Sequence, residues 1–103
     1  MRISILISTL SKKTLLQVDD NKKIVLYNGE KKNIDYKKLI ADICLLTSTW
    51  KSEYTKNSYI DGESFEIIID DNAKKLTYRG KNSFPDDYSS LKEILAEVGD
   101  AWF

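Results

Sequence analysis

The chain has 103 residues, of which 42% are hydrophobic and 31% charged, and its 16 basic residues balance its 16 acidic ones. This length and composition fit a single domain, residues 1–103, with one core, and they exclude a disordered chain. The sequence has no histidine and one cysteine. It therefore lacks the commonest general base and metal ligand, and it excludes an internal disulfide. We expect no catalytic residue, no metal site and no cofactor.

The first predicted element is a strand over residues 2–9. Ile3, Ile5 and Ile7 occupy every second position, which is the period of a strand with one buried face. The apolar run is too short for a signal peptide or for a membrane-spanning helix. The sequence thus predicts a cytoplasmic protein that does not bind membranes.

A hairpin and a helix come next. Leu16 and Val18 face inward on one strand of the hairpin, and positions 25 and 27 do so on the other. Leu15, Ile24 and Leu26 make the opposite face apolar too, which predicts a central hairpin or one covered on both sides. A helix predicted from residue 35 to about residue 49 has its apolar residues in one stripe. These are Tyr36, Leu39, Ile40, Ile43 and Leu46 or Thr47.

The second half predicts a similar series of elements. Trp50, Ser52 and Tyr54 share one face of a strand near residues 49–56. Positions 65, 67 and 69, then 76 and 78, form the apolar face of a second hairpin. Pro85 precedes a second helix, Asp86 or Asp87 can cap it, and Gly99 lies at its end. Its apolar stripe comprises Tyr88, Leu91, Ile94, Leu95 and Val98. Residues 100–103 form an aromatic tail.

The two halves resemble each other in sequence. With an offset of 51, residues 18–35 match residues 69–86 at seven of eighteen positions, including the Asp-Asp-Asn turn and a Tyr-x-Gly. This similarity predicts an internal duplication of a β-β-(β)-α unit, with pseudo-repeats at about 1–49 and 50–99. The alternative is that two hairpins acquired the same turn residues independently. Either reading predicts an α+β domain, an antiparallel sheet with two amphipathic helices packed on it.

Adjacent aspartates are the best candidates for chemistry. The sequence contains Asp19–Asp20, Asp70–Asp71 and Asp86–Asp87. Neighbouring side chains on extended backbone point to opposite faces, which opposes joint action on one metal ion or substrate atom. Turn formation and helix capping account for all six residues. We therefore expect that the protein is not an enzyme.

Charge is divided unequally along the chain. Residues 1–51 carry a net charge of +5 and residues 52–103 carry −5. Nucleic-acid binding would use the lysines of the first half, six of which lie between residues 22 and 38. The zero net charge of the whole chain and the core positions of Tyr27 and Tyr36 disfavour it.

A loop and helix start in the second half resemble a known pattern. Asp61, Gly62 and Phe65 are followed by Gly80, Asn82, Phe84, Pro85, Tyr88 and Leu91. This arrangement is similar to one in small bacterial proteins, and the size and composition of the chain resemble the immunity proteins of bacterial toxin systems, including contact-dependent growth inhibition. The resemblance implies a protein that binds a toxin and carries no catalytic motif.

These observations favour a stoichiometric protein-binding module, an immunity protein or inhibitor that neutralises a toxin such as a nuclease. The alternatives are a nucleic-acid-binding domain and an interaction domain that forms a homodimer through an exposed strand. For a protein partner, we expect acidic residues to steer association and aromatic residues to anchor it. The predicted contact residues are Trp50, Tyr54, Tyr59, Asp61, Glu63, Asp70, Asp71, Asp86 and Asp87. The alternative for the aromatic segment is a buried edge strand.

Overall fold

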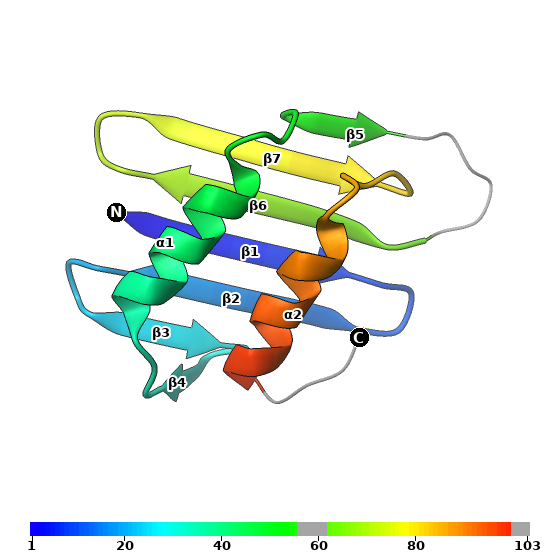
Figure 1. Ribbon diagram of the computed structural model, residues 1–103. Coiled ribbons are helices and arrows are strands. Elements are labelled where there is room, and N and C mark those ends of the chain that lie inside the picture. The colour runs from blue at the N-terminus through cyan, green and yellow to red at the C-terminus, as the bar shows by residue number, and fades with distance from the viewer. Residues whose placement is uncertain (56–61, 100–103) are drawn as a thin grey trace.

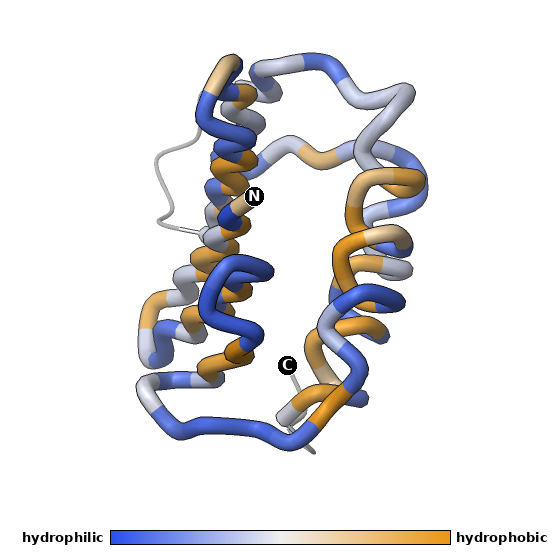
Figure 2. Tube along the Cα trace, turned by 90° about the vertical axis from the view of Figure 1, so that its left-hand side faces the viewer, coloured by the Kyte–Doolittle hydropathy of each residue, from blue (hydrophilic) through white to orange (hydrophobic). Residues whose placement is uncertain are grey.

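Both helices lie on the same face of one sheet, so the molecule has two layers (Figures 1 and 2). The computed structural model describes residues 1–55 and 62–99. The predicted aromatic tail lies outside the described residues. The strands are β1 (Arg2–Ser8), β2 (Lys13–Asp19), β3 (Ile24–Tyr27), β4 (Glu30–Lys32), β5 (Glu53–Thr55), β6 (Ser64–Asp70) and β7 (Lys75–Lys81), and the helices are α1 (Tyr36–Thr47) and α2 (Tyr88–Gly99). The predicted α+β class is confirmed.

The seven strands form one sheet in the order β4-β3-β2-β1-β6-β7-β5. β1 is its central strand, and Ile5 pairs with Leu16 of β2 on one side and with Ile67 of β6 on the other. Every pair is antiparallel except β5–β7, which is parallel. The prediction of an antiparallel sheet therefore needs one correction. The strand that follows α1 joins an edge of the sheet, beside a strand that runs in the same direction.

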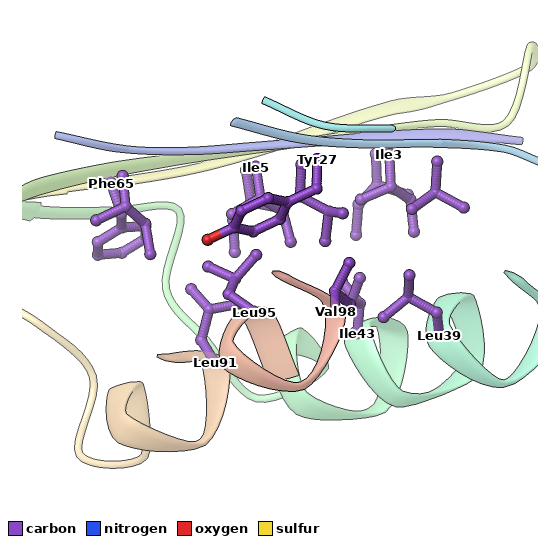
Figure 3. Close-up of a cluster of buried hydrophobic side chains, with 14 of the residues drawn as sticks. Ile3, Ile5, Tyr27, Leu39, Ile43, Phe65, Leu91, Leu95 and Val98 are labelled. Atoms are coloured by element: carbon purple, nitrogen blue, oxygen red, sulfur yellow. The ribbon is translucent and has the colours of Figure 1, made fainter. Parts of the chain in front are cut away.

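Strand alternation and the helix stripes together build the core (Figure 3). Every second residue of β1 and β6 points toward the helices, and Ile5 and Ile67 are fully buried there. The helices contribute Ile43 from α1, and Leu91 and Leu95 from α2, all with no exposed surface. The predicted stripes are thus the buried faces of both helices.

Aspartates form the two hairpin turns, as predicted, and another aspartate begins the first helix. Asp35 caps α1, where its carboxylate accepts hydrogen bonds from two backbone N–H groups. In the β2–β3 turn, the Asp19 carboxylate accepts from the Asn21 N–H at 2.9 Å. In the β6–β7 turn, the Asp71 carboxylate accepts from the Lys74 N–H at 2.7 Å. These bonds satisfy backbone donors that the strands leave unpaired.

The structure does not confirm the internal duplication. The offset of 51 places β2 on β6, and one more residue places α1 on α2. However, β2 and β6 are both antiparallel to β1, so they run in the same direction on its two sides. Each hairpin then continues away from β1, and both helices cover the same face (Figure 1). The two hairpin–helix units therefore have opposite topological handedness.

The helices cover only one face of the first hairpin. β2 is next to the centre of the sheet, but β3 lies beside the edge strand β4. Leu15, Ile24 and Leu26 are half-buried on the face that points away from the helices. The prediction of a hairpin covered on both sides is therefore corrected.

Candidate protein-binding groove between the helices

The aromatic residues predicted as partner contacts pack against the core. Trp50 is 8% exposed, and its ring meets Phe65 edge-on at a centroid distance of 5.6 Å. Its indole Nε1–H donates to the Asp87 carboxylate at 2.7 Å. Tyr54 is half-buried against Phe65, and its hydroxyl accepts from the Lys51 N–H at 3.0 Å. Trp50 is thus a core residue, which agrees with the alternative of burial and leaves little of its ring exposed for a partner.

The predicted acidic contacts do not form one surface. Glu63 pairs with Lys92 of α2 at 2.9 Å, whereas Asp70 faces Arg2 on the other side of the sheet at 3.4 Å. Asp71 forms the β6–β7 turn, and Asp86 is exposed before α2. The structure therefore distributes these residues over both faces of the sheet. Tyr59 and Asp61 lie outside the described residues.

A groove of about 480 Å³ runs between the two helices on the outer surface. The helices are antiparallel, so the end of α1 lies near the start of α2 (Figure 1). One flank of each helix lines the groove, together with the residues just after α1 and just before α2. The lining residues are Lys38, Asp42, Leu45, Leu46, Thr49, Asp87, Ser90, Glu93, Ile94 and Glu97.

The groove has an apolar floor and an acidic rim. Leu45 is 76% exposed, and Leu46 and Ile94 are half-buried beside it. Four carboxylates and one ammonium group line the groove. Lys38 lies 3.9 Å from Asp42, an exposed contact of the kind that contributes little stability. The groove as a whole therefore attracts positive charge.

Two of these carboxylates lower the stability of their own helix. Glu93 and Glu97 are four residues apart on α2, where like charges are neighbours and cost a few tenths of a kcal/mol. Glu97 also lies in the last turn of α2, which contains no basic residue, and the helix dipole disfavours a negative charge there. Local stability therefore does not explain this arrangement.

Two described side chains have a raised pKa. Burial raises the pKa of the Tyr88 hydroxyl above its usual range, and the nearby Glu63 carboxylate acts in the same direction. Burial also raises the pKa of the Cys44 thiol, which disfavours the reactive thiolate form. Within residues 1–55 and 62–99, no group of three or more acidic or cysteine side chains is arranged to hold a metal ion.

Neither described helix is long and apolar enough to cross a membrane. No protein-family model matches the chain, and comparisons with curated proteins and with solved structures found no significant similarity.

Sequence reasoning found Asp87 but missed the rest of the groove. The available signal was Leu45, an aliphatic residue that lies off the apolar stripe of its helix. Glu93 and Glu97 lie off the corresponding stripe of α2. The sequence does not record how the helices are paired. Leu45 and Ile94 line one groove only because both helices pack side by side on the sheet.

Proposed function

We propose that this chain is a stoichiometric protein-binding module that receives a positively charged protein surface in the groove between α1 and α2. One observation carries the proposal: an exposed leucine lines a groove that also bears four carboxylates and one lysine. An apolar anchor surrounded by charge of one sign is the anatomy of a protein-recognition site.

The two components of the groove have different roles in binding. The carboxylates act at a distance and raise the rate of association with a basic partner, an effect that salt weakens. Leu45 acts at contact, where burial of its exposed side chain slows dissociation. A basic amphipathic helix fits this shape, since its apolar face can cover Leu45 and Ile94 while its cations meet the rim.

We propose further that the partner is a bacterial toxin domain and that the protein acts as its immunity protein in the cytoplasm. Two arguments support this finer assignment. The pattern from Asp61 to Leu91 is similar to one in small bacterial proteins, and the size and composition of the chain resemble immunity proteins. Toxins that cleave nucleic acids need basic surfaces, and an acidic groove is complementary to such a surface.

Affinity capture with charge variants tests the proposal. The groove variant is Glu93→Lys with Glu97→Lys. Its matched control is Glu30→Lys with Glu53→Lys, which makes the same change in net charge on the two edge strands. We expect the wild type and the control to retain one basic protein from lysate of the source cells, and the groove variant to lose it.

The purified partner then gives the decisive measurements. Association with the groove variant should be at least about tenfold slower than with the wild type, and less sensitive to salt. Expression of the partner alone should inhibit growth, and co-expression of the wild type should restore it. The proposal fails if groove and control variants bind the partner equally well. The immunity assignment alone fails if the partner binds in the groove but does not inhibit growth.

A further inference from the structure

The sheet face opposite the helices carries aliphatic side chains. Strands that face water normally carry polar side chains at such positions. Five half-buried aliphatic residues cover four neighbouring strands, and Leu6 and Leu15 are paired directly across β1 and β2. This open-face patch consists of Leu6, Leu15, Ile24, Leu26 and Ile68. On β7 the residues that point the same way are Lys75, Thr77, Arg79 and Lys81, all polar. The contrast marks the patch as a candidate contact surface.

The patch can be covered without burying an unpaired charge. Between its aliphatic residues lie the uncharged Ser4 and Gln17, which pair across β1 and β2. Two ion pairs lie at its border, Arg2 with Asp70 at 3.4 Å and Arg79 with Glu66 at 3.7 Å. Lys75 and Lys81 of β7 lie beside them, outside the apolar centre. A partner with the same mixture of apolar centre and paired charges fits it.

The size of the face matches that of a dimer interface. Strand spacing and rise give the sheet a planar footprint of roughly 600 Å². Side chains enlarge the accessible area, and a standard interface needs roughly 800 Å² from each partner. A depression of about 420 Å³, lined by Ser4, Gln17, Leu26 and Ile68 among others, runs over the face and can receive side chains of a second sheet.

The other surfaces are poorly suited to self-association. The edge strand β4 has three residues, Glu30 to Lys32, all of them charged, and β5 also has three. Short charged edges prevent strand pairing between molecules. The groove between the helices has an excess of negative charge and repels a second copy of itself.

We propose that two copies of this chain associate through their open sheet faces. The result is a four-layer dimer with the two sheets inside and the helices outside (compare Figure 2). The interface is isologous, so Leu6, Leu15 and Leu26 of each copy bury against the sheet of the other. Both interhelical grooves stay accessible on opposite outer surfaces. The dimer does not depend on the proposed function, but it would make any groove binder bivalent.

Sedimentation velocity over a micromolar to submillimolar concentration series tests this dimer. We expect the wild type to approach twice the chain mass of 11.9 kDa. The variant Leu6→Glu with Leu15→Glu should remain a monomer, since it places four carboxylates in the dimer interface. The matched control is Leu45→Glu, which makes the same type of change on the helix side and should still form the dimer.

A second variant separates loss of the dimer from loss of the fold. Gln17 is exposed and already polar, so Gln17→Arg should leave the far-UV circular dichroism unchanged while the added cation blocks the interface. We expect this variant to be a folded monomer. A wild type that stays monomeric throughout the series overturns the proposal, as does a folded Gln17→Arg variant that dimerises like the wild type.

Discussion

Replacement of Trp50 tests whether this residue stabilises the core or contacts a partner. The ring is 8% exposed and packs edge-on against Phe65 and Tyr78, at centroid distances of 5.6 and 6.5 Å. Truncation of a buried tryptophan to alanine costs about 3–5 kcal/mol, because apolar contacts are lost and a cavity remains. For a domain of this size such a loss lowers Tm by at least about 12 °C. We expect Trp50→Ala to show both effects.

The hydrogen bond to Asp87 accounts for part of this cost and can be measured separately. Trp50→Phe keeps an aromatic ring but removes the Nε1–H that donates to the carboxylate at 2.7 Å. A hydrogen bond to a buried charged group contributes about 1.5–3 kcal/mol. Asp87 is only half-buried, so its bond to Trp50 should contribute about 1 kcal/mol. Asp87→Ala leaves the indole N–H unpaired. The double variant, Trp50→Phe with Asp87→Ala, should therefore lose less free energy of unfolding than the two single variants together.

Urea denaturation followed by far-UV circular dichroism is the appropriate assay, since the substitution itself alters fluorescence. Leu45→Ala is the control, because its exposed side chain should change the free energy of unfolding by less than about 0.5 kcal/mol. If Trp50→Ala is as mild as the control while it weakens partner binding, the indole is a contact residue and the packing described above is refuted.

Leu39→Ala in α1 and Leu91→Ala in α2 should each lower the free energy of unfolding by about 2–5 kcal/mol in the same assay. Unchanged stability in either variant would show that its helix does not pack on the sheet. Gly80→Ala should cost about 1–3 kcal/mol, because its Cβ would collide with the Phe65 ring and a neighbouring backbone carbonyl, whereas unchanged stability would contradict that close approach. The raised pKa of Tyr88 means that the folded state holds this proton longer than the unfolded state, so the free energy of unfolding should fall as pH rises above about 10. Tyr88→Phe should make this alkaline loss smaller, and an identical pH profile would contradict the assignment.

The sequence predicted elements well and their arrangement less well. Period-two alternation located β1, β2 and β6, and the apolar stripes located both helices, because burial on one face imposes these periods whatever the neighbours are. Partners in the sheet depend on long-range pairing that no local pattern records. Two features therefore could not be predicted from local patterns: the position of β1 between β2 and β6, and the parallel pairing of β5 with β7.

The predicted contact residues do not form one surface, for a related reason. Trp50 occurs in a polar segment, which suggested exposure, but it packs beneath the start of α2 and its one polar atom is paired there. Tertiary structure decides whether an aromatic residue in a loop is an anchor or a core residue. The acidic groove was equally hidden, since its two flanks come from helices separated by forty residues of sequence.

The central position of β1 has a consequence for how the chain folds during synthesis. β2 follows β1 directly, but β6, its other neighbour, begins only at residue 64. Until those residues leave the ribosome, one edge of β1 has no partner, and Ile3, Ile5 and Ile7 lack half of their cross-strand contacts. An unpaired apolar strand is prone to aggregation. Folding should therefore be limited by one late, long-range closure, and a fragment that stops at residue 49 should collapse without reaching a stable sheet.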